Sequence, residues 1–446
     1  MSRNINTFSL FDFSKKRADK VQLFGEESLD EDGNVIPFIE QAAIVTHFLQ
    51  LRDSNITLPY ELKAKTLLDL WYKFVSGEKG QLSNDFVGFS DSPTACQAYL
   101  FPDLFKAPFQ APKEPKFTFI DLFAGIGGFR MALQNLGGQC VFSSELDEQA
   151  KKTYYANYGD VPFGDITKES TKNKIPKDFD VLCAGFPCQA FSLAGKRLGF
   201  ADETRGTLFF DVAEILRRYQ PKAFFLENVK GLVSHDKGRT FKTILRTLDE
   251  VGYIVPDPEI VNAMYFGVPQ HRERIYIVGF RKDLGIGKDD FSYPEQKKVT
   301  KKWIDVREEK PVPAKYYLST TYIDTLIRHK ARHEAKGHGF GYDIIPDDGI
   351  AHAIVVGGMG RESNLVIDFR QKDLTPTTRI KGEVNKQGWR KMTPREWARL
   401  QGYPDNFRIV VSDASAYKQF GNSVAVPAIQ ATARALLKSL TDKNII

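Results

Sequence analysis

The fold follows from one stretch, Phe117-Thr-Phe-Ile-Asp-Leu-Phe-Ala-Gly-Ile-Gly-Gly128, in which an apolar run meets a turn with three glycines. A short apolar run of this kind is typical of a buried strand. Glycine permits a left-handed backbone and lets a ligand approach closely. A helical pattern follows over Phe129–Leu136. The stretch therefore predicts a strand, a ligand-binding turn and a helix, although a tight turn that merely requires glycine would leave the same pattern.

Further apolar runs follow this stretch and alternate with helical patterns. The predicted strands are Phe117–Phe123, Cys140–Ser143, Phe179–Ala184, Ala223–Leu226, Tyr253–Asn262 and Arg274–Phe280. Strands that alternate with helices of about ten or more residues indicate an α/β fold with a doubly wound, mostly parallel sheet. Ligands bind such sheets at the carboxyl ends of the strands. The polar motifs described below each follow a predicted strand, so we expect one common site there.

The N-terminal region differs from the rest of the chain. Apolar residues recur at helical spacing in Ile36–Leu51 and Leu58–Phe74, on either side of Asp53-Ser-Asn55. Two helices joined in this way could form a DNA-binding helix-turn-helix or a helical pack that covers the main domain, and we favour the second. The prolines between positions 102 and 115 indicate an extended linker to the sheet.

Composition excludes several classes of protein. Hydrophobic residues make up 42% of the 446 residues and charged residues 26%, which is typical of a globular protein. No apolar run approaches the roughly 18 residues of a membrane helix, and no secretory signal is recognised, so we expect no membrane part and a cytoplasmic location. The net charge of +6 permits contacts with phosphates. The four cysteines lack metal-site spacing, and His329 and His333 lie among basic residues of a solvated helix face, so no metal is expected.

Two acidic residues are candidates for binding a nucleoside. Glu145 lies about twenty residues after the glycine turn, where an acid binds ribose hydroxyls in nucleotide folds. Asp165 ends the next segment and could accept a hydrogen bond from an adenine amino group. The crowded glycines provide no evident cradle for a pyrophosphate. This favours a nucleoside without a phosphate chain, such as S-adenosylmethionine.

The candidate nucleophile is Cys188, which follows a predicted strand in Pro187-Cys188. A thiolate is a soft nucleophile that needs an electropositive setting, whereas Cys183 lies within the strand and is expected in the core. Glu227 ends another strand, where burial would raise its pKa and let it share a proton, unless it is a solvated or helix-capping acid. Arg272 and Arg274 alternate before the last strand and could clamp a polar group, or form surface salt bridges.

Read together, these segments resemble the cytosine-5 DNA methyltransferases. The matching strings are Phe119-Ile-Asp-Leu-Phe-Ala-Gly-Ile-Gly-Gly-Phe129, Gly185-Phe-Pro-Cys-Gln-Ala-Phe-Ser192, Glu227-Asn-Val229, Gln270-His-Arg-Glu-Arg274, Met392-Thr-Pro-Arg-Glu396, Gln401-Gly-Tyr-Pro404 and Gln419-Phe-Gly-Asn-Ser-Val424. The resemblance extends from about Phe117 to the C-terminus. It implies a Rossmann-like methyltransferase core that uses S-adenosylmethionine and acts on a cytosine flipped out of double-stranded DNA.

The resemblance also implies roles for single residues. Cys188 would attack C6 of cytosine, Glu227 would hydrogen-bond N3 and the exocyclic amine, and Arg272 and Arg274 would hold the ring and the DNA backbone. The residues expected around the cofactor are Phe123, Gly125, Gly127, Glu145, Leu146, Asp165, Ile166, Pro187, Asn422 and Val424. The residues expected to contact DNA are Ser192, Arg197, Arg205, Arg361, Arg370 and Arg379. The loop 193–207 resembles a mobile lid over the extruded base.

The resemblance divides the chain into four parts. These are an N-terminal helical accessory region (1–110), a catalytic domain (117–295), a target-recognition domain (296–390) and a C-terminal segment that returns to the catalytic domain (391–446). Three segments of the recognition part, at 315–321, 355–362 and 375–378, are similar to bacterial restriction-modification enzymes that methylate CCGG. We therefore expect a monomeric bacterial modification enzyme.

Three alternatives remain at this stage. A tRNA cytosine-5 methyltransferase shares much of this core, but that branch carries a Cys-Phe-Thr motif, and residues 281–390 contain no cysteine. A catalytically inactive DNA-binding relative would not need Cys188, Glu227 and both arginines. A nicotinamide-dependent oxidoreductase would explain the glycine turn and leave the Pro187-Cys188 motif unexplained.

Overall fold

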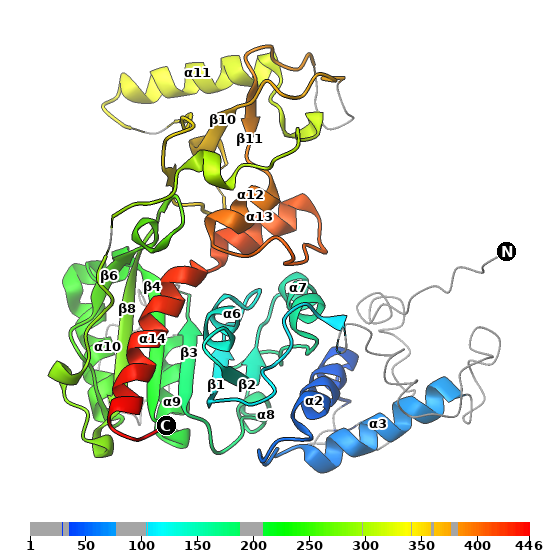
Figure 1. The fold of residues 1–446 in the computed structure, drawn as a ribbon, viewed down its shortest axis with the longest axis vertical. Helices are drawn as coiled ribbons and strands as arrows, with labels where there is room; N and C mark the ends of the chain where they lie inside the picture. The colour runs from blue at the N-terminus through cyan, green and yellow to red at the C-terminus, as the bar shows by residue number, and fades with distance from the viewer. Residues whose placement is uncertain are drawn as a thin grey trace.

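The computed structural model describes residues 29, 35–76, 104, 106–187, 208–296, 298–339, 341–357, 361–375 and 382–446. A seven-stranded sheet forms its centre, in the order β2-β1-β3-β4-β8-β5, with β6 also paired to β8. The strands are β1 (Phe117–Leu122), β2 (Gly138–Ser144), β3 (Val181–Gly185), β4 (Ala223–Val229), β5 (Tyr253–Ile254), β6 (Glu259–Asn262) and β8 (Glu273–Arg281). Strands β1 to β4 are parallel, and β8 is antiparallel to its neighbours. The predicted mostly parallel sheet is confirmed (Figure 1).

Helices cover both faces of this sheet. Side chains on one strand alternate between the faces, so a strand with a continuous apolar run presents apolar side chains to helices on both sides. On β1, Ile120 packs in one buried cluster with helices α9 and α10, whereas Phe119 packs in the other with α6 and α14. The helices of the core are α6 (Gly128–Gln134), α7 (Glu148–Tyr158), α8 (Glu169–Lys172), α9 (Leu208–Tyr219), α10 (Arg239–Glu250) and α14 (Val426–Asp442). This arrangement is the doubly wound fold that the alternating pattern predicts.

One predicted strand is wrong. The run Tyr253–Asn262 forms two short strands, β5 and β6, instead of a single one. Pro256 and Pro258 lie between them. Proline has no N–H to donate to a strand ladder, so the pairing with β8 is interrupted there.

The two N-terminal helices, α2 (Phe38–Leu51) and α3 (Glu61–Ser76), pack beside the edge of the sheet at β2 (Figure 1). Their apolar residues, such as Val45 and Leu67, belong to the same buried cluster as Ile120 of β1. They therefore share a hydrophobic core with the sheet. This is the arrangement expected of a helical pack that covers the main domain.

Residues from about 300 to 422 build a second part above the sheet in Figure 1, and the chain then returns to the sheet as α14. Its elements are α11 (Thr320–Glu334), β9 (Ala351–His352), β10 (Leu365–Ile367), β11 (Trp389–Lys391), α12 (Pro394–Leu400) and α13 (Asp413–Asn422). Strand β9 pairs with β7 (Gln270–His271), which immediately precedes β8, and β10 pairs with β11. The 3-10 helices are η3 (Lys230–Leu232), η4 (His235–Gly238), η5 (Ala263–Phe266), η6 (Lys282–Leu284), η7 (Lys288–Asp290), η8 (Trp303–Val306), η9 (Ala314–Tyr316) and η10 (Glu362–Asn364). In the described part of the chain, no helix has both the length and the apolar character that crossing a bilayer requires.

Two polar residues, Asn422 and Ser423, lie just before α14 but do not cap it. Ala425 is the N-cap and makes no side-chain capping bond. Asn422 instead ends α13, and the Ser423 hydroxyl lies 2.7 Å from the hydroxyl of Tyr403. The chain needs three residues to turn from α13 into α14, which moves the helix start beyond both polar side chains.

Candidate functional site

A cavity of about 630 Å³ opens at the carboxyl ends of β1 to β4. Its walls include nine of the ten residues predicted around the cofactor, namely Phe123, Gly125, Glu145, Leu146, Asp165, Ile166, Pro187, Asn422 and Val424. Three of the four predicted catalytic residues, Glu227, Arg272 and Arg274, line the same cavity. Side chains far apart in the sequence thus meet where the strand order predicts a ligand.

The glycine turn opens directly onto this cavity. Gly125 has a φ of +56°, and a Cβ added there would meet no atom within 4 Å. Its amide donates a 2.7 Å hydrogen bond to Oε2 of Glu145. The other carboxylate oxygen, Oε1, accepts from the amides of Leu146 and Asp147. Three backbone donors therefore fix the Glu145 carboxylate at the end of β2, and the turn leaves open space beside it.

The second acidic side chain lies on the next segment. Oδ1 of Asp165 accepts hydrogen bonds from the amide and the hydroxyl of Thr167, at 3.0 and 2.8 Å. Ile166 beside it is buried. An oriented carboxylate next to an apolar side chain can bind one edge and one face of a purine ring. The structure thus places both acids, Glu145 and Asp165, in a single cavity with different local surroundings.

Glu227 lies at the end of β4 and is 8% exposed. Nε of Arg274, on the neighbouring strand β8, lies 3.2 Å from Oε1 of Glu227. Burial raises the pKa of Glu227 above its ordinary value, and the charges of Arg274 and Arg272 oppose this shift. A carboxyl group in this setting can hold a proton and donate it within the cavity.

Arg272 is buried and held by three backbone carbonyls. Its guanidinium donates to the carbonyl oxygens of Ile354, Gly421 and Ser423, at 2.9, 3.2 and 2.6 Å. Burial, followed by the charge of Arg274, lowers the pKa of Arg272 to about 9, which leaves it charged at neutral pH. Its Nε has no hydrogen-bond partner within the described part of the chain. Three of the five guanidinium N–H groups thus bond the backbone.

Gly127 is the exception among the residues predicted around the cofactor. It does not line the cavity, and its φ is +81° at the N-terminus of α6. A Cβ added there would lie 2.3 Å from the ring of Tyr158, whose hydroxyl donates to the Gly127 carbonyl. The structure therefore favours a packing role for Gly127 over the predicted contact with the cofactor. This glycine allows the turn to pack on α7.

Replacing Gly127 with alanine is expected to lower the free energy of unfolding by about 3 kcal/mol, because the left-handed backbone and the crowded ring both penalise a Cβ. Chemical denaturation of the two proteins measures the difference. Gly231→Ala is the matched control, because a Cβ at that exposed glycine meets nothing within 4 Å. An unchanged stability of Gly127→Ala would contradict the packing role.

Five predicted site residues and the loop 193–207 lie outside the described residues. The five are Cys188, Ser192, Arg197, Arg205 and Arg379. The described residues on either side of positions 188–207 are Pro187 and Leu208, and both line the cavity.

The two remaining arginines predicted to contact DNA differ in their surroundings. Arg361 is exposed, and its guanidinium lies 5.5 Å from the ring centre of Tyr417. Arg370 donates to the carboxylate of Asp368 and to the carbonyls of Glu308 and Glu309. These contacts engage all three of its nitrogens. The structure therefore favours an internal structural role for Arg370 over the predicted DNA contact.

The cavity also contains residues to which the sequence analysis assigned no role. Asn228 donates to the carbonyl of Phe186 at 2.8 Å and accepts from the amide of Val229, which fixes the loop before Pro187. Lys418 and Gln419 of α13 contact Asp147 and the carbonyl of Gln149. Asn228 and Gln419 belong to motif strings quoted above, so their membership in those motifs could have identified them as site residues. No cluster of three or more metal ligands occurs among the described residues, which include His329 and His333.

Comparisons with known proteins agree with this geometry. The sequence model of the family described as "C-5 cytosine-specific DNA methylase" matches residues 117–438. The chain is 74% identical over 326 residues to Type II methyltransferase M.HpaII of Haemophilus parainfluenzae, covering 73% of this chain and 90% of that protein. It is 48% identical to Type II methyltransferase M1.ScrFI of Lactococcus lactis subsp. cremoris, covering 76% and 82%.

A solved structure of similar fold is the Dnmt2 methyltransferase of S. pombe. Its TM-score is 0.53 at 18% identity, and the match covers 73% of this chain and 99% of that one. At that identity the likeness concerns the fold alone. The family match leaves α2 and α3 outside its bounds.

Proposed function

The chain belongs to the C-5 cytosine-specific DNA methylase family and is a type II DNA (cytosine-5)-methyltransferase, and on this premise we propose that its cavity binds S-adenosylmethionine beside a cytosine flipped out of duplex DNA. The observation that carries this proposal is the meeting of Glu145, Asp165 and Glu227 in one cavity next to Pro187. The family match excludes the oxidoreductase alternative.

The residues around the glycine turn fit S-adenosylmethionine. A volume of about 630 Å³ is in the usual range for a small-molecule site. The fixed carboxylate of Glu145 suits a pair of ribose hydroxyls, and Asp165 with Ile166 suits an adenine ring. The open space at Gly125 allows a close approach of the ligand to the backbone. When bound there, S-adenosylmethionine supplies an activated methyl group.

Glu145→Gln is expected to raise the KM for S-adenosylmethionine about tenfold while kcat changes much less. The substitution removes the charge from a carboxylate that would accept from the cofactor hydroxyls, and charged hydrogen bonds contribute about 1.5–3 kcal/mol. Steady-state kinetics with varied cofactor measure the effect. Glu148→Gln, an exposed neighbour on α7, should behave like the unchanged protein. Equal KM values for the two variants would count against the assignment.

The chemistry follows from the weak nucleophilicity of cytosine C5. The thiolate of Cys188 forms a bond to C6, which turns the ring into an enamine, and Glu227 gives its proton to N3 as the charge develops. C5 then takes the methyl group. Loss of the C5 proton to a base such as water, departure of the thiolate and return of the N3 proton to Glu227 restore the aromatic ring. We infer that Arg274, which contacts Glu227, and the buried Arg272 hold the polar edge of the ring.

We propose that the part formed by residues 296–390 reads the DNA sequence and that the target is CCGG. The proposal rests on the resemblance of its segments at 315–321, 355–362 and 375–378 to CCGG-methylating enzymes. Because one chain supplies every assigned side chain, we also propose that the enzyme acts as a monomer, within the bacterial cytoplasm.

Sequencing of 5-methylcytosine in DNA from cells that express the protein tests activity and target together. The expected result is methylation confined to one cytosine of CCGG. Methylation at another motif would overturn the target and keep the activity. Unmodified DNA combined with methylated tRNA would instead support the tRNA alternative.

A further inference from the structure

We propose that helix α2, which lies outside the family match, positions the cofactor site by holding the segment Tyr158–Ile166 through Thr46, His47 and Gln50. This segment ends in Asp165 and Ile166, two walls of the cavity. The inference rests on the proposed binding of S-adenosylmethionine in that cavity. It gives the N-terminal region a part in the reaction.

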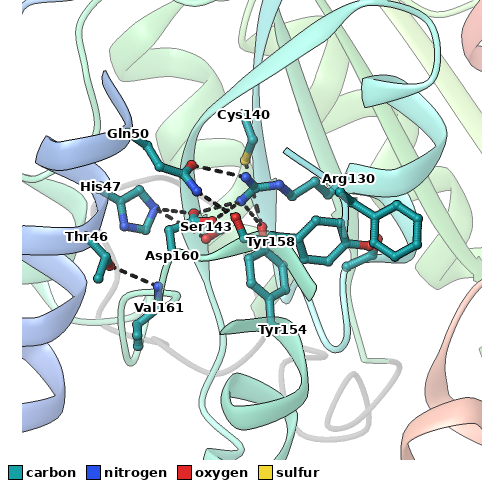
Figure 2. Close-up of polar contacts among 12 residues, drawn as sticks. Thr46, His47, Gln50, Arg130, Cys140, Ser143, Tyr154, Tyr158, Asp160 and Val161 are labelled. Atoms are coloured by element: carbon teal, nitrogen blue, oxygen red, sulfur yellow. Dashed lines mark hydrogen bonds and ion pairs between the residues drawn. The ribbon is translucent and has the colours of Figure 1, made fainter. Parts of the chain in front are cut away.

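Two side chains of α2 complete backbone hydrogen bonds of this segment (Figure 2). The Thr46 hydroxyl accepts from the amide of Val161 at 3.0 Å and donates to the carbonyl of Ala42 at 2.8 Å. Nε2 of Gln50 donates to the carbonyl of Tyr158 at 2.6 Å. Thr46 is fully buried. Buried backbone groups need such partners, and here the N-terminal helix supplies them.

A buried ion pair lies at the same junction. Arg130 of α6 contacts Asp160 at 2.6 Å, and both side chains are fully buried. Oε1 of Gln50 accepts from Arg130 at 3.2 Å, and Nε2 of His47 lies 3.4 Å from Asp160. Burial lowers the pKa of His47 although Asp160 opposes the shift. A buried ion pair depends on its surrounding hydrogen bonds, so α2 helps to keep Asp160 in place.

The opposite side of the segment is tied to the end of β2. The amide of Phe163 donates to the carbonyl of Ser143, and the amide of Glu145 donates to the carbonyl of Phe163, at 2.8 and 2.9 Å. The Phe163 ring packs against His47, with centroids 4.7 Å apart, and against Tyr60, which precedes α3, at 5.4 Å.

The segment is therefore held between the N-terminal helices and the strand that carries Glu145. Both acids of the proposed cofactor site are connected to this segment. The amide of Glu145 is hydrogen-bonded to it, and Asp165 lies within it, two residues after Phe163. The carboxylate of Glu40, also on α2, lies against Gly164, where an added Cβ would be 2.6 Å from Oε1. A shift of α2 would therefore displace both Glu145 and Asp165, because this short backbone segment connects them to the helix.

Thr46→Val in the full-length protein tests this inference, because it keeps the side-chain shape and removes the hydroxyl. We expect the Kd for S-adenosylhomocysteine, measured by calorimetry, and the KM for S-adenosylmethionine to rise about five- to twentyfold. We expect kcat at saturating cofactor to stay within about twofold. Hydrogen exchange at 159–166 should become faster. Thr46→Ser, which retains the hydroxyl, should restore the unchanged values.

Thr66→Val is the matched control, because within the described part of the chain its hydroxyl bonds only the Leu62 carbonyl of its own helix α3. The inference is overturned if Thr46→Val binds the cofactor product like the unchanged protein, or if it lowers kcat and leaves Kd unchanged. Should Thr46→Val fail to fold, Gln50→Leu, at a half-buried position, decides by the same readouts.

The two proposals fail in different ways. If the unchanged protein does not bind S-adenosylhomocysteine, the proposed cofactor site is wrong. Hydrogen exchange at 159–166 would then still show whether α2 holds the segment.

Discussion

Replacing Cys188 with alanine is expected to lower methyl transfer to duplex DNA by at least about 10⁴-fold. Without the sulfur no bond forms at C6, and C5 of the intact aromatic ring is too weak a nucleophile to take the methyl group. DNA binding should survive, because it depends on contacts with phosphates and bases elsewhere. Transfer of labelled methyl groups to a CCGG duplex measures the first effect, and a gel-shift titration measures the second.

Cys183→Ala is the matched control. Cys183 lies in β3, five residues before Cys188, and is fully buried. Burial raises the pKa of its thiol, so it provides no thiolate, and its removal should leave turnover nearly unchanged. DNA that contains 5-fluorocytosine should trap the unchanged protein and Cys183→Ala covalently, and should fail to trap Cys188→Ala. Residual turnover or trapping by Cys188→Ala would refute the assigned nucleophile.

Glu227→Gln is expected to reduce kcat by about 10²- to 10³-fold while binding of S-adenosylmethionine stays close to normal. Glutamine keeps the shape and can still donate to the ring, but it cannot transfer a proton to N3. The loss should therefore appear in kcat, as measured by single-turnover methyl transfer at saturating DNA.

The pH profile provides a second readout for the same residue. Burial raises the pKa of Glu227, so its protonated form persists to a higher pH than that of an exposed glutamate. The proposed mechanism uses the protonated form, so we expect kcat of the unchanged protein to fall as pH rises through this pKa. The variant should lack that fall. Glu273→Gln, between the two arginines and outside the cavity walls, is the control expected to keep it.

The sequence sufficed for the sheet and for most of the cavity, because both depend on local patterns. Apolar runs locate β1 to β4, and the topology of a parallel sheet brings their carboxyl ends together. The split of Tyr253–Asn262 could have been read from Pro256 and Pro258. The role of Gly127 could not, since its neighbour Tyr158 lies 31 positions away and only the packed structure shows on which side of the turn a side chain would collide.

Other contacts were beyond sequence reasoning for the same reason. Arg370 and Arg361 look alike in the sequence, yet Arg370 finds carbonyl acceptors about sixty positions earlier. The bonds from α2 to Tyr158 and Val161 span more than a hundred positions. A helical pattern predicts that a helix has a buried face, but it does not predict which backbone groups that face will meet.

The carbonyl contacts of Arg272 have a consequence for exchanging target specificity between related enzymes. One guanidinium joins the strand next to Glu227, the end of the β9 segment at Ile354, and the turn that leads into α14. The pairing of β7 with β9 also stabilises this junction. A transplanted reading segment that replaces this junction would change the Ile354 partner of Arg272, so we expect a splice point beyond Ile354 to preserve methyl transfer when the target specificity is exchanged.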